Sequence, residues 1–352
     1  MRTAVALLVV VCAQRASGEE ACAADFPSVD ISPFLVPDDS PLASARDATA
    51  AAWDHAMREW GFARVTGDGV PPDAFAPFRA AALDFFDEPL ERKRAYSDPS
   101  GRYGPEGYTS LGVESVGRTS AGALGGEGAG AQPDLVENVA LRGRPPASID
   151  DLASRPRFPP TLFPSAGEHW AAMDMLHGAI LRMTARALGV PDELFEGAYR
   201  GTQANALRLA HYPAVPGGVD SLPAGQARYG AHTDYQGYTL LMQDPTVGGL
   251  EVFRAPNATA GRMAGEWVAV PPGGLVVNAG DLIELWVNGR WRSAMHRVTN
   301  SAITQRRLSI AFFTGPRHDA LVEPLLQPGE ARRFDAVIAG EHLQRKLAMS
   351  NV

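Results

Sequence analysis

Eight short segments rich in β-forming residues follow one another between residues 206 and 314, and they restrict the fold more than any other feature. Turns containing Gly, Pro or Asn separate the segments. Short strands at such regular spacing are typical of an antiparallel sandwich or jelly roll. The predicted strands are 206–212, 228–232, 239–243, 250–253, 267–270, 275–278, 294–298 and 308–314. We therefore predict a mainly β fold with flanking helices, built on a double-stranded β-helix (jelly-roll) core.

Amphipathic segments on both sides of this β-rich region predict helices that brace the core. The expected helices are 40–61, 71–88, 165–189 and 329–349, and short strands are expected at 26–34 and 61–66. Ser165 and Glu168 have the spacing of a capping box, in which each side chain satisfies a backbone N–H at the start of a helix. Gly189 is typical of a helix end.

The first 18 residues have the layout of a secretory signal peptide. A basic residue at position 2 precedes an apolar run over 3–13, and small residues follow at 16–18. The run is shorter than the roughly 20 apolar residues of a membrane span. We expect entry into the secretory pathway and no stable membrane insertion after cleavage. A buried strand, a membrane anchor, organelle targeting and a cytoplasmic location are the alternatives.

Two further features bear on that route. The chain has only two cysteines, Cys12 and Cys22, so cleavage near Gly18 would leave one cysteine and no intramolecular disulfide. Asn257 begins an Asn-Ala-Thr glycosylation sequon, which has meaning only if the chain enters the secretory pathway. The net charge of −8 argues against a general nucleic-acid partner, because such proteins need a basic face.

A glycine-rich stretch at 122–130 resembles a phosphate-binding loop only superficially. No lysine followed by Ser or Thr closes it, and no strand-to-helix context surrounds it. We interpret it as a surface loop, with a mobile lid over a binding site as the alternative.

Three residues have the types and spacing of a metal centre: His232, Asp234 and His296. In a strand, residues i and i+2 point to the same face, so His232 and Asp234 would present two ligands from one rigid element. A strand predicted over 294–298 would supply the third. Two imidazoles and one carboxylate leave open positions on iron, as in non-haem Fe(II) oxygenases.

Eleven residues after His296, Arg307 and Ser309 would share one face of a strand. A guanidinium holds a carboxylate through two parallel hydrogen bonds, and a hydroxyl adds one more. A buried arginine needs a neutralising anion, so the pair predicts an anion site. An intramolecular salt bridge is the alternative.

These motifs resemble the Fe(II)/2-oxoglutarate (2OG)-dependent dioxygenases of the isopenicillin N synthase-like superfamily. The resemblance extends from about Phe26 to Pro316. The residues that carry it, in order, are Trp60-Gly-Phe-Ala-Arg-Val, Tyr212-Pro213, His232-Thr-Asp234, Gly249-Leu-Glu-Val, Val277-Asn-Ala-Gly-Asp281, Ser293-Ala-Met-His296-Arg-Val and Arg307-Leu-Ser309. By this resemblance the chain divides into a signal peptide (1–18), an N-terminal dioxygenase region (19–200), the jelly-roll core (201–318) and a helical tail (319–352).

The resemblance implies a role for each motif. His232, Asp234 and His296 would bind Fe(II); Arg307 and Ser309 would hold the distal carboxylate of 2OG, with Tyr212 nearby. O₂ is the oxidant and ascorbate a candidate reductant. The implied reaction converts 2OG into succinate and CO₂ while a small-molecule substrate is hydroxylated, desaturated or cyclised. Ala210 departs from the family, because many relatives have Asn there; Gln243 or Asn205 are candidate replacements.

Three rival functions stay open on sequence alone. A relative could use the Arg-Leu-Ser motif to hold the carboxylate of its own substrate and need no 2OG. A non-catalytic binding protein could keep the fold after losing activity. Two histidines and a carboxylate could also bind Zn(II) for hydrolysis. Neither the substrate nor the oligomeric state follows from the sequence.

Overall fold

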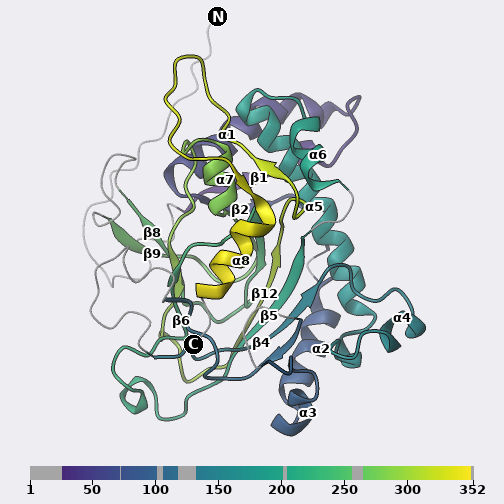
Figure 1. The fold of residues 1–352 in the computed structure, drawn as a ribbon, viewed down its shortest axis with the longest axis vertical. Helices are drawn as coiled ribbons and strands as arrows, with labels where there is room; N and C mark the ends of the chain where they lie inside the picture. Colours follow the sequence, from purple (N-terminus) through teal and green to yellow (C-terminus); the bar gives the residue numbers. More distant parts are fainter. Residues whose placement is uncertain are drawn as a thin grey trace, which may run out of the picture.

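A computed structural model describes residues 26–71, 73–100, 106–117, 132–200, 204–255 and 265–349 (Figure 1). The predicted signal peptide, Cys12, Cys22, the stretch 122–130 and Asn257 lie outside these residues. Among the described helices, none is both long and apolar enough to cross a membrane.

Three sheets are present among the described residues. The largest has eight strands in the order β1-β2-β10-β7-β12-β5-β4-β3, and the second has four in the order β6-β11-β8-β9. Strands β13 and β14 pair separately. The bounds are β1 Ser28–Asp30, β2 Phe62–Thr66, β3 Gly107–Thr109, β4 Glu137–Arg142, β5 Ala206–Tyr212, β6 Tyr229–His232, β7 Tyr238–Met242, β8 Leu250–Arg254, β9 Glu266–Ala269, β10 Leu275–Ala279, β11 His296–Val298, β12 Arg307–Phe313, β13 Leu321–Val322 and β14 Val337–Ile338.

All eight strands predicted between residues 206 and 314 are present as β5 to β12, within one to two residues at each end. They form two sheets that pack face to face. Phe62 and Val276 of the large sheet share a buried apolar cluster with Val252 and Val268 of the small one. The predicted double-stranded β-helix core is therefore confirmed.

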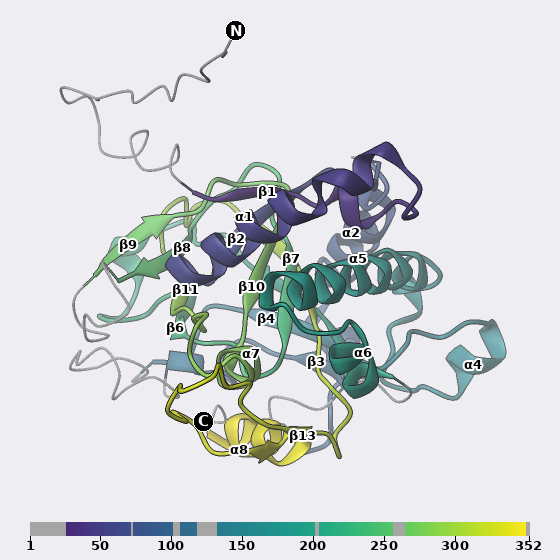
Figure 2. The same ribbon diagram turned by 90° about the horizontal axis from the view of Figure 1, so that it is seen from above.

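Several of the described helices, α1 and α5 among them, cover the outer face of the large sheet. The bounds are α1 Arg46–Glu59, α2 Ala76–Phe86, α3 Leu90–Arg94, α4 Ile149–Ala153, α5 Ser165–Leu188, α6 Glu193–Tyr199, α7 Asp281–Trp286 and α8 Ala339–Met349, with 3₁₀ turns at Ser32–Phe34, Pro41–Ala45, Pro160–Leu162 and Val219–Ser221. Figure 2 shows α1 and α5 side by side on this face. The Trp170 ring of α5 packs edge-on against Phe312 of β12, 4.9 Å between centroids. The predicted bracing by helix 165–189 is confirmed.

The strands alternate between two environments. On β12, Leu308, Ile310 and Phe312 belong to the buried cluster under the helices. Arg307, Ser309, Ala311 and Phe313 line a cavity on the opposite face. The period of two along a strand thus separates packing residues from site residues.

Two expectations about helix ends were wrong. Ser165 is already the first residue of α5 and makes no capping bond; its hydroxyl instead donates to the Leu162 carbonyl. The predicted helix 329–349 begins only at Ala339. The preceding segment is not helical; the Asn288 side chain holds it by donating to the Ala331 carbonyl and accepting from the Arg333 N–H.

Candidate active site

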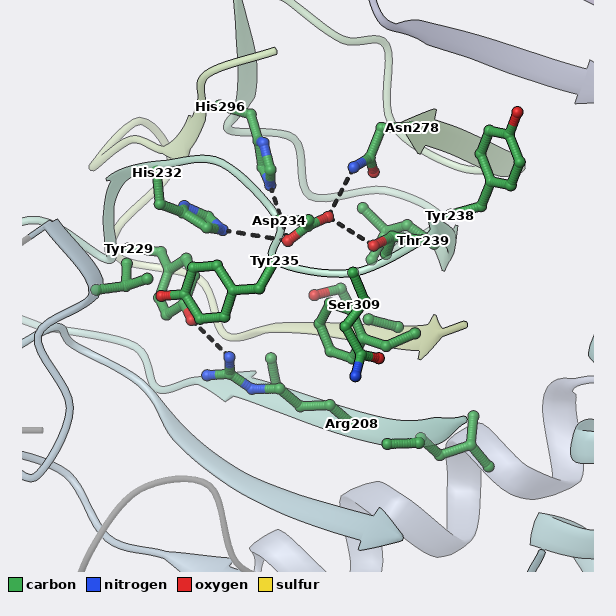
Figure 3. A pocket seen from close by; sticks show the side chains of 18 of the residues that line it. Arg208, Tyr229, His232, Asp234, Tyr235, Tyr238, Thr239, Asn278, His296 and Ser309 are labelled. Carbon is green, nitrogen blue, oxygen red and sulfur yellow. Dashed lines mark hydrogen bonds and ion pairs between the residues drawn. The ribbon is translucent and has the colours of Figure 1, made fainter. Parts of the chain in front are cut away.

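His232, Asp234 and His296 meet where the edge strand β6 of the small sheet pairs with β11 (Figure 3). His232 is the last residue of β6 and His296 the first of β11, and the two are direct cross-strand partners. Asp234 lies just beyond β6, so the expectation that it shares a strand with His232 was wrong. Its carboxylate nevertheless lies close to both imidazoles.

The geometry of the three side chains suits one metal ion. Oδ1 of Asp234 lies 3.7 Å from Nε2 of His232 and 3.8 Å from Nε2 of His296. One ligand atom from each residue falls within 4.8 Å of the others, and all three residues are buried. Ligand bonds of about 2.0–2.2 Å place donor atoms at such separations around a shared ion.

Backbone carbonyls orient both imidazoles. Nδ1 of His232 donates to the Gly230 carbonyl at 2.9 Å, and Nδ1 of His296 donates to the Ala294 carbonyl at 3.1 Å. A carbonyl can only accept, so the proton lies on Nδ1 and the lone pair of each Nε2 faces the centre. Burial lowers the pKa of His232 to about 3, and the neighbouring His296 adds to the effect. A neutral imidazole is the form that binds a metal.

Two side chains, those of Thr239 and Asn278, hold the Asp234 carboxylate by hydrogen bonds. Its Oδ2 accepts hydrogen bonds from Thr239 Oγ1 and Asn278 Nδ2, both at 2.6 Å (Figure 3). Burial alone would raise the pKa of Asp234, but the two imidazoles and these two donors lower it overall. The carboxylate is therefore ionised, with Oδ1 directed at the imidazoles. Such outer partners fix a ligand's orientation.

Arg307, Ser309 and Tyr212 lie together in the same cavity. Arg307 and Tyr212 are cross-strand partners on β12 and β5. The Arg307 guanidinium stacks 5.1 Å from the centroid of the Tyr212 ring and donates to Ser309 Oγ at 3.2 Å.

Arg307 is 1% exposed, and its Nε has no hydrogen-bond partner among the described residues. None of the ion pairs between described residues includes it. The alternative of an intramolecular salt bridge is therefore not supported within the described part of the chain. Burying a guanidinium without an anion is costly, so the site is suited to a carboxylate ligand.

A buried charged network forms another wall of the cavity. Arg208 donates to Glu114 Oε2 at 2.6 Å and to Tyr229 Oη at 2.5 Å, and Tyr229 Oη donates to Glu114 Oε1 at 2.5 Å. No sequence signal points to this network, because Glu114 and Arg208 are far apart in the chain. Burial raises the pKa of Glu114 and Arg208 opposes that rise.

Small side chains on neighbouring strands leave space for the cavity. Ala140 of β4 and Ala311 of β12 flank Arg208 of β5 in one cross-strand row. Helix α8 covers the row of strand residues that line the cavity, and its Leu343 and Leu347 line the cavity as well. Figure 1 shows α8 lying across the sheet near β12 and β5.

Asp281 links α8 to the candidate metal centre. Its Oδ2 pairs with Lys346 Nζ of α8 at 2.7 Å, and its Oδ1 accepts from Ser293 Oγ at 2.7 Å. The Asp281 N–H donates to the carbonyl of Asp234 at 2.8 Å. One residue therefore contacts the C-terminal helix, the segment leading to His296 and the backbone of Asp234.

Ala210 lines the cavity between Asn138 of β4 and Ser309 of β12. Neither predicted replacement for the family Asn stands beside it. Gln243 donates to the carbonyls of Pro271 and Gly273, and Asn205 accepts from the Gly315 N–H. Its cross-strand partner on β4 is Asn138, which is fully buried.

Comparison with known proteins gives this arrangement a family. The model of the 2OG-Fe(II) oxygenase superfamily matches residues 203–316, and that of the N-terminal region of non-haem dioxygenases in morphine synthesis matches residues 26–166. The homoarginine-6-hydroxylase 2-ODD-233 of Oryza sativa subsp. japonica is 30% identical over 339 residues, covering 91% of this chain and 96% of the relative.

Solved structures of similar proteins have the same fold. A full-length Neurospora crassa protein in complex with alpha-KG superposes with a TM-score of 0.73 at 28% identity, covering 94% of this chain and 100% of that one. JOX2 in complex with 2OG, Fe and JA gives a TM-score of 0.68 at 27% identity, covering 92% of this chain and 84% of that one.

The chain belongs to the 2OG-Fe(II) oxygenase superfamily. It is an Fe(II)- and 2OG-dependent dioxygenase, an oxidoreductase with a jelly-roll core.

Proposed function

We propose that His232, Asp234 and His296 bind the Fe(II) of this dioxygenase. The observation that carries the proposal is the convergence of three buried donors beside a buried arginine that lacks a carboxylate among the described residues. Two neutral imidazoles and one ionised carboxylate match the donor set of non-haem Fe(II) oxygenases.

Arg307 would hold the distal carboxylate of 2OG. Its guanidinium lies in the cavity that the metal ligands line, and Ser309 and Tyr212 sit beside it. Ser309 would add a hydroxyl donor, while the Tyr212 ring keeps the guanidinium flat against β5. Bidentate binding by an arginine fixes both the position and the direction of a carboxylate.

When bound, Fe(II) supplies the redox chemistry that couples conversion of 2OG into succinate and CO₂ to oxidation of a substrate C–H bond. The chain contributes the rest. The hydrogen bonds from Thr239 and Asn278 keep the Asp234 carboxylate ionised and directed at the two imidazoles. The apolar residues of α8 exclude water from the cavity. Exclusion of water protects the reaction from unproductive side reactions.

The substrate would be a small molecule, and hydroxylation the outcome. Relatives carry names such as homoarginine-6-hydroxylase, and JOX2 is seen with JA bound. The cavity beneath α8 has room because alanines stand where larger side chains could be, and Arg208, Tyr229 and Tyr235 add polar edges. Desaturation or ring closure uses the same site.

Anaerobic loading with Fe(II) and 2OG, followed by O₂ and a screen of small metabolites scored by succinate release, tests this function. Asp234→Ala should abolish succinate formation, and Arg307→Met should raise the KM for 2OG by at least about tenfold. His55→Ala is the matched control, because His55 is solvent-exposed on α1. Full activity of Asp234→Ala would contradict the ligand assignment, and O₂ uptake without 2OG would favour the 2OG-independent rival. The same assay with and without ascorbate tests the expected reductant.

We also propose that the chain enters the secretory pathway through residues 1–18, on the basis of their basic start, apolar run and small-residue exit. Expression of the full chain in eukaryotic cells, followed by N-terminal sequencing of the product, tests this. A mature protein that still starts at Met1 would refute it.

A further inference from the structure

Arg208 lines the cavity well away from the residues assigned to 2OG. Its cross-strand partner on β12 is Ala311, four positions after Arg307. At about 3.4 Å per residue, the α-carbons of the two arginines lie roughly 13 Å apart along the sheet. The Arg307 guanidinium stays beside Tyr212 and Ser309, so a molecule of 2OG held there and on the metal is too short to reach Arg208. Arg208 therefore faces the part of the cavity that is left for the substrate.

Tyr229 connects Arg208 with the candidate metal centre. The Tyr229 ring packs edge-on against the His232 imidazole, with 4.8 Å between centroids, and the Arg208 guanidinium lies 4.9 Å from the centroid of the same ring. Figure 3 shows the Tyr229 side chain between the other two. A substrate group that contacts Arg208 would thus lie one side chain away from a metal ligand.

The charges that line the cavity can be matched one by one. Among the described residues, the charged side chains of the lining are those of Arg142, Arg208, Asp234 and Arg307. Under the proposed function, the metal ion matches Asp234 and 2OG matches Arg307. Arg142 stands opposite Ala206, one row beyond Arg208, and is only half-buried, so water screens its charge. The electrostatics of the substrate end therefore depend on Arg208.

Glu114 neutralises Arg208. The two side chains pair at 2.6 Å and are 1% and 7% exposed, respectively. Tyr229 Oη donates to Oε1 of Glu114 at 2.5 Å, and Asn138 Nδ2 donates to its Oε2 at 3.3 Å. Burial raises the pKa of Glu114, but these three donors hold the ionised form, because an ionised carboxylate only accepts hydrogen bonds. The wall that faces the substrate thus contains one cation and one anion, and its net charge is zero.

A substrate carboxylate beside this pair would lose its hydration and meet a guanidinium whose charge Glu114 already offsets. An uncharged polar group costs far less to desolvate. We infer that the substrate is an uncharged polar molecule and that Glu114 determines this specificity by excluding carboxylates from the substrate end of the cavity. The inference rests on the proposed function and adds the charge of the substrate to it.

Ligand NMR of the full chain, loaded with Mn(II) and excess 2OG, tests the inference before the substrate is known. Mn(II) speeds the relaxation of protons on any small molecule that enters the cavity, so the signal reports binding close to the metal. The probes are matched pairs on one carbon skeleton: benzamide with benzoate, and cyclohexanecarboxamide with cyclohexanecarboxylate. Glu114→Gln removes the anion and keeps an oxygen that can accept from Arg208. The double variant Glu114→Gln/Arg208→Gln removes both charges.

The wild type should bind the carboxamides more tightly than the carboxylates. Glu114→Gln should strengthen binding of the carboxylates by at least about tenfold and leave that of the carboxamides within about threefold, because an unmatched buried cation then attracts anions. The double variant should lose this gain. A wild type that prefers carboxylates, a Glu114→Gln variant without the gain, an equal gain for carboxamides, or a double variant that keeps the gain would each overturn the inference.

Two further measurements separate the causes of failure. Thermal unfolding and 2OG affinity show whether each variant keeps the fold; if Glu114→Gln does not fold, the preference of the wild type between the paired probes decides alone. If the wild type binds no 2OG in the presence of Mn(II), the proposed function is wrong and the inference falls with it. If it binds 2OG but does not distinguish carboxamides from carboxylates, only the inference about Glu114 fails.

Discussion

The hydroxyl of Thr239 allows a sharp test of how the candidate metal centre is built. It donates one of two 2.6 Å hydrogen bonds to Oδ2 of Asp234, and Asn278 donates the other. Thr239→Val replaces the hydroxyl by a methyl group of similar size, so the packing of β7 changes little. Asp234 would then keep only the bond from Asn278 and could rotate away from the two imidazoles.

The expected magnitude follows from the charge of the acceptor. A buried hydrogen bond to an ionised group contributes about 1.5–3 kcal/mol. At about 1.4 kcal/mol per factor of ten, its loss should weaken metal binding between about tenfold and a hundredfold. Titration of the metal-free chain with Mn(II) at constant pH, followed by calorimetry, measures this directly.

Thr239→Ser is the matched control, because it keeps the hydroxyl and removes only a methyl group. It should bind Mn(II) within about threefold of wild type, the donor being retained. If Thr239→Val also binds Mn(II) within about twofold of wild type, Asp234 does not depend on this donor and the reasoning is refuted.

Three further predictions concern a buried histidine of α5 and the contacts of α8. Burial lowers the pKa of His169 from 6.5 to about 3, so below pH 6.5 the unfolded chain binds a proton that the native chain does not. Stability is therefore present above pH 6.5 and is lost as the pH falls toward 3, by about 1.4 kcal/mol at pH 5.5. His169→Phe should reduce this loss in denaturant unfolding at pH 5.5 and 7.5, and an unchanged difference between the two pH values would count against it. Leu343→Trp, which fills the cavity from α8, should raise the KM for the substrate at least about fivefold and leave 2OG binding unaltered; equal effects on both would refute the placement of α8. Lys346→Met removes the 2.7 Å ion pair with Asp281 and should speed hydrogen exchange in α8 while Mn(II) binding stays within about twofold; unchanged exchange would show that the pair does not hold the helix.

The sequence predicts the strands well because β-forming composition and the turn residues between strands are local properties. Each of the eight segments between 206 and 314 is short, rich in β-forming residues and bounded by turn residues, and β5 to β12 follow them closely. The two-residue period of a strand correctly places Arg307 and Ser309 on one face of β12. This period does not apply at Asp234, because β6 ends at His232 and Asp234 lies beyond the strand.

The contacts that finish the site are long-range and leave no periodic signal. Glu114 reaches Arg208 across 94 positions, and Asn278 reaches Asp234 across 44. The segment before α8 likewise depends on a distant residue, because Asn288 hydrogen-bonds its backbone at Ala331 and Arg333. A local pattern cannot reveal which polar side chain the fold will bring to a buried partner.

The position of β12 has a consequence for biosynthesis. This strand lies between β7 and β5, although both precede it in the chain by more than sixty residues. Until residues 307–313 emerge from the ribosome, β7 and β5 each present an unpaired edge, the kind of edge at which chains associate wrongly. Arg307 arrives on that same strand. The step that closes the large sheet therefore also completes the cosubstrate pocket, so a nascent chain cannot hold 2OG before its principal sheet is whole.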